Sequence, residues 1–133
     1  MIRCVTLAAV MVAVSSAALF VAVPAAAQTA RNFPATALRG ELVVTDPPNV
    51  LLNRQPARLA PGARIRGADN LLQMSGVVAG QPLLVHYTLD PLGLVLDVWV
   101  LTADELARKP WPTTPQQAAT WAFNPDTQSW SRP

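Results

Sequence analysis

The sequence predicts an all-β fold: a small five-stranded barrel, in the size class of OB and SH3-like barrels, followed by one short C-terminal helix and a tail that contains prolines and tryptophans. The length of 133 residues suggests one domain. With 51% hydrophobic and 14% charged residues, the composition is the opposite of that of a disordered chain. Short apolar runs alternate with turn residues at close spacing, which is typical of small barrels and sandwiches. A small β-sandwich is the alternative, although it usually needs about seven strands.

The first 27 residues are predicted to be a secretory signal peptide. Arg3 precedes an apolar run over residues 5–23, and Pro24 and three alanines follow it. This order of charge, apolar stretch and small residues predicts cleavage after Ala27. The run is also close to the length of a membrane span, so a retained anchor is the alternative, which Pro24 disfavours. Cleavage would remove the single cysteine, Cys4, and would leave no membrane span. We therefore expect a periplasmic or secreted protein without disulfides.

Three parts are predicted after the signal. Residues 28–37 have no periodicity and indicate a flexible lead-in, whereas residues 38–109 carry the strand signals of the barrel domain. Residues 110–133 are rich in proline and polar residues and predict an extended tail without a core of its own. Three tryptophans lie in this tail. We expect Trp111 to pack back beside the helix end, while the other two either pack back, dock into a partner or stay disordered.

The first half of the barrel domain predicts three short strands. Residues 38–45 alternate in part and end in β-branched residues, and a two-proline break separates them from a strand over residues 50–52. A turn over residues 53–56 follows. The pair Pro61–Gly62 then suits a type II turn before a short strand over residues 63–66. In that strand Ile65 would face the core, and both flanking arginines would face outward.

The second half contains the clearest element, a hairpin of residues 83–90 and 94–101. Asp90, Pro91 and Gly93 suit a three-residue loop with Gly93 in the left-handed region. The register favoured by this loop pairs Leu89 with Val95, Tyr87 with Asp97, and Val85 with Trp99. A two-residue loop would instead pair His86 with Asp97, and one step of slip would turn every side chain to the other face.

Two further segments flank the hairpin. Residues 67–82 fit either a helical turn or a bulged strand, because short apolar runs cannot be assigned by periodicity alone. After the hairpin, Thr102 and Glu105 have the spacing of a capping box, which predicts a short helix through about Arg108. Pro110 would end that helix, since the residue before a proline avoids the helical region.

A group of four arginines is the first candidate for function. They lie within 13 positions, with no acidic residue between them, and would form one basic face of a small barrel: Arg54, Arg58, Arg64 and Arg66. Arginine favours bidentate contacts to carboxylate or phosphate groups, so this face would suit a lipid headgroup, an acidic glycan or an acidic protein surface. A solvated strand face balanced by nearby acids is the other interpretation. Nucleic acid is not expected, because no stacking aromatics accompany these arginines.

A barrel mouth lined by Tyr87, Trp99 and Met74 is the second candidate and would make the protein a small-ligand carrier. The third is an enzyme that uses the single histidine, His86, in the register that pairs it with Asp97. No strained serine elbow accompanies His86, and the mature chain offers too few ligands for a metal site. We therefore expect a protein that is not an enzyme and holds no cofactor or metal.

The run Leu51–Arg66 (LLNRQPARLAPGARIR), together with Val98–Thr102 (VWVLT), resembles a segment of small exported proteins of Gram-negative bacteria to which no function is assigned. The resemblance covers about residues 38–108. It implies an exported β domain and supplies no activity, substrate or catalytic residue. The sequence as a whole predicts a non-enzymatic exported module that binds or supports another component of the cell envelope, and it leaves the oligomeric state open.

Overall fold

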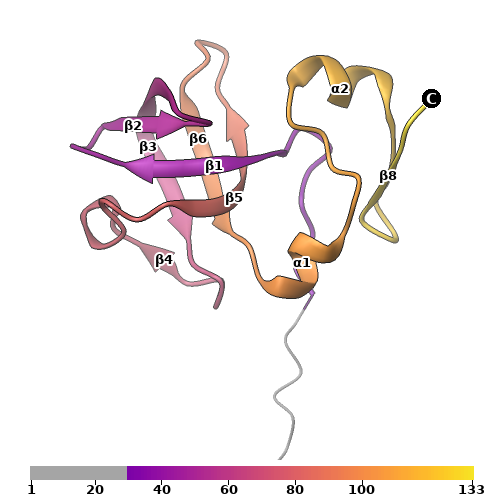
Figure 1. Ribbon diagram of the computed structural model, residues 1–133, viewed down its shortest axis with the longest axis horizontal. Coiled ribbons are helices and arrows are strands. Elements are labelled where there is room, and N and C mark those ends of the chain that lie inside the picture. The colour runs from indigo at the N-terminus through magenta and orange to yellow at the C-terminus, as the bar shows by residue number, and fades with distance from the viewer. Residues whose placement is uncertain (1–29) are drawn as a thin grey trace, which may run out of the picture. The chain divides into compact units, whose positions relative to one another are not determined.

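Five strands of the computed structural model close into a barrel (Figure 1), as the sequence predicts. The structure describes residues 30–133, so the expected signal peptide over residues 1–27 lies outside the described part. Around the barrel the strands follow the order β1-β2-β3-β6-β5 and return to β1. All neighbours are antiparallel except β3 and β6, which run parallel. The strands are β1 (Leu38–Val44), β2 (Asn49–Leu52), β3 (Gln55–Arg66), β5 (Leu83–Leu89) and β6 (Val95–Val100).

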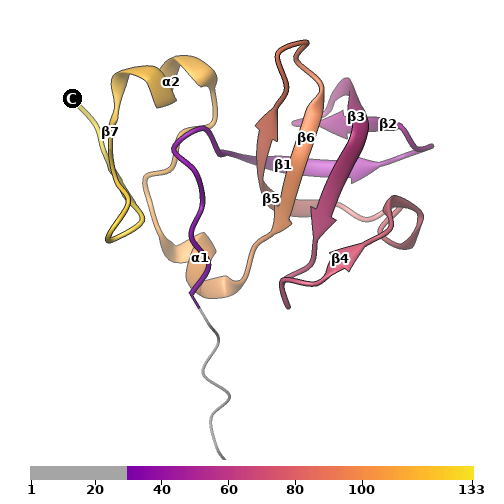
Figure 2. The same ribbon diagram turned by 180° about the vertical axis from the view of Figure 1, so that it is seen from behind.

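Shorter elements complete the described chain. The segment over residues 67–82 contains both structures that its pattern allows: a two-residue strand and a 3₁₀ turn. These elements are β4 (Leu72–Gln73), η1 (Ser75–Val77), α1 (Ala103–Ala107), α2 (Pro115–Thr120), β7 (Ala122–Asn124) and β8 (Ser129–Ser131). Figure 2 shows α2 and the β7–β8 hairpin beside the barrel, with α1 near the end of β6. None of the helices in residues 30–133 is long and apolar enough to span a membrane.

Alternation along the strands fills the barrel with aliphatic side chains and one tyrosine. Removing this apolar surface from water contributes roughly 25 cal/mol per Å² and is the main driving force for closing the barrel. The buried cluster consists of Leu38, Leu42, Val44, Val50, Leu59, Ile65, Val78, Val85, Tyr87, Val95 and Val98.

β3 is one long strand with a bulge. The prediction of a type II turn at Pro61–Gly62 is therefore wrong, because these residues lie within the bulge. The turn after β2 consists of Asn53 and Arg54, which both have positive φ, as a two-residue hairpin turn requires. Farther along β3, the pairing with β6 jumps from Leu59 to Arg64, so three extra residues bulge out. Gly62, with a φ of 78°, supplies the left-handed conformation within the bulge. The expected inward direction of Ile65 is confirmed, since this side chain is buried in the core.

The predicted turn of the β5–β6 hairpin is confirmed. Beyond the turn, the strands follow neither of the two predicted registers. The amide of Asp90 donates to the carbonyl of Leu94 at 2.8 Å, and Leu89 pairs with Val95. One extra residue on β6 then shifts the register, so that His86 pairs with Trp99. Without this bulge Asp97 would face the core, where an unpaired carboxylate is costly. The bulge turns Val98 into the core instead and leaves Asp97 outside.

The capping box of α1 is confirmed. The hydroxyl of Thr102 accepts a hydrogen bond from the Glu105 amide at 3.3 Å, and the Glu105 carboxylate accepts one from the Thr102 amide at 2.9 Å. These two contacts satisfy amide groups that a helix start would otherwise leave without an acceptor. The five-residue helix ends at Ala107, close to the predicted end.

The described residues of the lead-in, 30–37, and the tail over residues 110–133 pack together, and the tail contains a helix and a hairpin where the sequence predicts an extended segment. Phe33, Ala37, Trp111 and Trp130 are buried in a second apolar cluster, with Trp121 and Phe123 packed against it. In Figure 1 the lead-in, coloured indigo, runs between the barrel and the C-terminal segment. Neither segment holds enough apolar residues for a core of its own, but together they cover His86 and Trp99 on the outer face of β5 and β6. The expectation that Trp111 packs back is confirmed.

Replacing a core leucine should destabilise the barrel far more than replacing an exposed one. We expect Leu42→Ala to lower the free energy of unfolding by about 2–5 kcal/mol, because it leaves a cavity in a fully buried site. Leu71→Ala, at a side chain that is 65% exposed, should change it by less than about 0.5 kcal/mol. Urea denaturation followed by circular dichroism measures both values. Equal effects of the two substitutions would contradict the assigned core.

Candidate functional site

The four candidate arginines lie along β3 and the turn before it. Arg58, Arg64 and Arg66 alternate with the inward Leu59 and Ile65 and therefore occupy the outer face of β3. Arg64 donates from Nε to Oδ1 of Asp97 at 3.1 Å. Within residues 30–133, the other three arginines of the group have no carboxylate within salt-bridge distance. The outer face of β3 thus carries more positive than negative charge.

A groove opens beside these arginines, and sequence reasoning missed it. β2 pairs with Gln55–Arg58 and β4 pairs with Ile65–Arg66 along the edge of β3 that faces away from β6. Between them, residues 60–63 have no register partner on β2, β4 or β6. The resulting groove has a volume of about 590 Å³. Its lining includes Pro47, Pro48, Ala60, Ala63, Arg64, Leu72 and Met74.

Exposed apolar side chains surround the β4 end of this groove. Leu71, Leu72, Met74 and Val77 are all more than 60% exposed, and Leu72 and Met74 line the groove itself. Single exposed leucines are common on soluble proteins, whereas a contiguous apolar patch indicates an interaction surface. We call the groove together with these four residues the β3–β4 surface.

Tyr87, Trp99 and Met74 lie in three separate surroundings and do not line one cavity. Tyr87 is in the barrel core, where burial raises the pKa of its phenol although Asn53 acts in the opposite direction. The β6 bulge turns Trp99 to the outer face, where its ring meets Phe33 edge to face at 5.6 Å. Met74 is 79% exposed beside η1. The structure therefore does not bring together the expected barrel-mouth residues.

His86 is on the outer face of β5, as expected, but it is completely buried there. Its ring stacks on Trp111 at 4.1 Å and meets Phe33 edge to face at 4.4 Å. Nε2 accepts a hydrogen bond from Arg39, so the neutral ring carries its proton on Nδ1, which has no partner among the described residues. Burial and the charges of Arg39, Arg31 and Arg108 lower the pKa of His86 to about 3. The imidazole is therefore a neutral packing group that substrate cannot reach.

Arg39 joins the barrel to α1. Besides the bond to His86, its guanidinium donates to the carbonyls of Glu105 at 2.8 Å and Leu106 at 3.3 Å, in the last turn of α1. A cation is favourable there because the carbonyl end of a helix is partly negative. Burial lowers the pKa of Arg39 although Glu105 acts to raise it. Its carbon Cζ also lies 5.6 Å from the Trp111 ring centroid, so Arg39 stabilises the cover over His86.

The second buried arginine, Arg31, forms an ion pair with Glu105. Its Nε and Nη2 donate to the two carboxylate oxygens at 2.8 and 2.5 Å, and it also donates to the carbonyls of Gly67 and Val100. Burial alone would raise the pKa of Glu105, but the bonds from Arg31 and Thr102 and the charges of Arg31 and Arg108 outweigh it and lower that pKa. Sequence reasoning found Glu105 only as a helix cap and missed both arginines.

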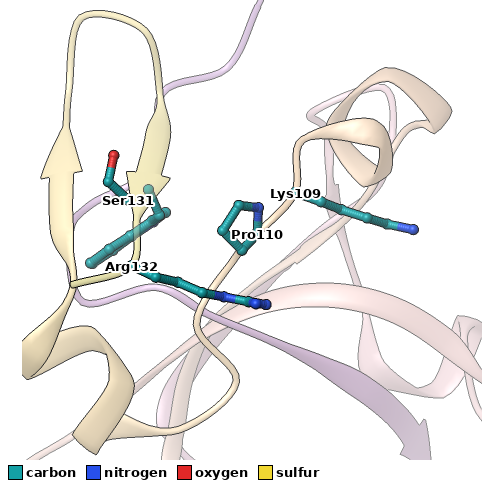
Figure 3. A pocket seen from close by; sticks show the side chains of 5 residues that line it. Lys109, Pro110, Ser131 and Arg132 are labelled. Carbon is teal, nitrogen blue, oxygen red and sulfur yellow. The ribbon is translucent and has the colours of Figure 1, made fainter.

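Two further cavities lie at the tail. One, of about 450 Å³, is lined by Lys109, Pro110, Trp130, Ser131 and Arg132 (Figure 3). The other, of about 430 Å³, is apolar and lies between the start of β1, the end of β5 and α2. Its lining residues are Ala35, Thr36, Leu38, Leu89, Pro115, Ala118 and Ala119. In the described part of the chain, no three histidine, cysteine or acidic side chains gather as metal ligands would.

The buried His86 should make stability depend on pH below neutrality. In the unfolded chain histidine takes up a proton near pH 6.5, whereas in the folded protein its pKa is about 3. The unfolded state therefore binds more protons, and the free energy of unfolding falls as pH drops below 6.5, by about 1.4 kcal/mol per pH unit. His86→Gln should flatten this slope between pH 6.5 and 5, measured by urea denaturation. An unchanged slope would contradict a neutral, buried His86.

Comparison with protein-family models, with curated proteins and with solved structures finds no match to this chain. The features of the described chain that bear on function are an arginine-rich strand face, a groove with an apolar rim, a buried histidine and two cavities at the tail.

Proposed function

We propose that this protein is an exported, non-enzymatic binding module that docks a protein component of the cell envelope on its β3–β4 surface. The observation that carries the proposal is the groove of about 590 Å³, which combines exposed apolar side chains with the arginines of β3. Apolar anchors in a groove supply binding energy, and charges around it supply steering and specificity.

The apolar part of the surface favours a protein partner. Leu72 and Met74 offer flexible apolar side chains at one end of the groove, and Pro47 and Pro48 form the other end. A thioether side chain adapts to irregular partners, which suits an interaction surface. The partner would insert apolar side chains between these two ends and remove the exposed patch from water.

The charged part favours an acidic partner. In the strand register, Arg58 lies opposite Asn49 beside the Pro47–Pro48 end, and Arg66 lies opposite Leu72 at the other end. Both ends of the groove therefore have an arginine that forms no described salt bridge. Carboxylates that flank the apolar anchors of the partner would pair with them. A protein segment combines both chemistries, which a glycan or a lipid headgroup does not.

A second candidate function, a small-ligand carrier, is favoured by the apolar cavity between Leu38, Leu89 and α2, whose size falls within the range of ligand pockets. The residues first expected to line such a site, Tyr87 and Trp99, take no part in it. Catalysis is not part of the proposal, because the buried, uncharged His86 is the only histidine and faces Trp111 and Phe33.

Charged substitutions at the apolar rim should abolish docking. Leu72→Asp with Met74→Asp places two carboxylates in the groove, and we expect at least a tenfold loss of the captured partner in pull-downs from the native envelope. Leu92→Asp is the matched control, because Leu92 is 84% exposed in the β5–β6 turn, away from the groove. If both proteins capture the same partners in equal amounts, the groove is not the docking site.

Reversing charge beside the groove should weaken binding and reduce its dependence on salt. We expect Arg58→Glu with Arg66→Glu to lower the association rate of the captured partner about tenfold at low salt, measured by surface plasmon resonance. Arg54→Glu, in the β2–β3 turn, is the control and should have a smaller effect. An association rate that is equally insensitive to salt in all three proteins would show that the arginines do not recognise an acidic partner.

A further inference from the structure

The pocket at the junction of α1 and the tail collects positive charge. Lys109 follows the end of α1, Ser131 is the last residue of β8, and Arg132 comes directly after that strand. In Figure 3 the Arg132 side chain extends from β8 toward Pro110, whereas Lys109 points away from β8. No acidic side chain is among the lining residues of this pocket. Arg132 therefore faces the space, and Lys109 adds to the positive potential around it.

The neighbouring part of the fold adds to this charge. Arg31, Arg39 and Arg108 each interact electrostatically with Glu105. Arg108 directly precedes Lys109 in the chain and brings a further positive charge close to the pocket. A surplus of positive charge in a partly buried region is costly and would be relieved by an anion.

Two buried donors near this junction have no acceptor among the residues that the structure describes. Trp130, which lines the pocket, is only 5% exposed, and its indole N–H has no such partner. The other donor is Nη1 of Arg108, which precedes Lys109 in the chain and is not among the lining residues. Buried donors are almost always hydrogen-bonded, and leaving one unsatisfied costs roughly 1–3 kcal/mol. At the pocket, Arg132 therefore supplies a positive charge, and Trp130 supplies an indole N–H that lacks an acceptor.

We infer that this pocket binds a small organic anion, with its carboxylate against Arg132 and its apolar body against Pro110 and Trp130. The apolar body follows from the lining, which includes the ring of Pro110 and the indole of Trp130. A carboxylate accepts two hydrogen bonds from a guanidinium, which makes Arg132 the principal anchor. This site is separate from the β3–β4 surface, and neither proposal depends on the other.

Nuclear magnetic resonance of the protein, in the form that its host produces, tests the site through the Trp130 indole. The chain has four tryptophans, and Trp130→Phe identifies the indole N–H signal that belongs to Trp130. Benzoate is the probe, and benzamide is its uncharged counterpart of the same shape. We expect benzoate, but not benzamide, to shift the Trp130 signal in a saturable way at constant ionic strength.

Variants separate a built site from general charge attraction. Arg132→Gln should raise the dissociation constant for benzoate at least about tenfold, because it removes a charge-assisted hydrogen bond. Arg54→Gln, an exposed arginine in the β2–β3 turn, should leave the constant within about twofold. An unshifted Trp130 signal, an equal shift with benzamide, or an equal loss in the two variants would overturn the inference. An equally strong effect of inorganic phosphate would show that the apolar wall plays no part.

Discussion

The ion pair between Arg31 and Glu105 connects four parts of the chain that are far apart in sequence. Arg31 comes from the lead-in, and its guanidinium reaches α1 through Glu105, the loop after β3 through Gly67, and the end of β6 through Val100. Both side chains are more than 90% buried, so removing either would leave an uncompensated charge, at a cost of about 3–5 kcal/mol. Because this pair holds the lead-in and α1 against the barrel, it also positions Phe33 and Trp111 over His86.

Features that depend on neighbouring residues could be predicted from the sequence. The β5–β6 turn follows from Asp90, Pro91 and Gly93, and the capping box follows from Thr102 and Glu105, because these contacts form within four residues. The barrel follows from short alternating strands. The β6 bulge could not be predicted from the sequence. It keeps Asp97 out of the core, and this advantage can be recognised only once the pairing of β6 with β5 is known. The packing of the lead-in on the tail depends on contacts across about 95 residues, such as that between Phe33 and Gln128.

In the candidate site, too, local features could be predicted and features that depend on distant contacts could not. The arginines of β3 were visible as a run without acids, and their outward direction follows from the alternation around Ile65. The groove was invisible, because it exists only where β2 and β4 pair with separate parts of β3. The unpaired donors of Trp130 and Arg108 could not be predicted either, because whether a donor finds an acceptor within residues 30–133 depends on its folded surroundings.

The bulge of β3 also disfavours strand pairing between two copies of this protein. Residues 60–63 lie on a strand edge that β2 and β4 leave open, and an open edge ordinarily invites a second chain to extend the sheet. Pro61 has no amide hydrogen, and Gly62, with its φ of 78°, turns the backbone out of a regular ladder. Another chain would find no continuous row of donors and acceptors there. Residues 60–63 thus leave the groove accessible to the side chains of a partner, and they also disfavour edge-to-edge association of copies of this chain at high concentration.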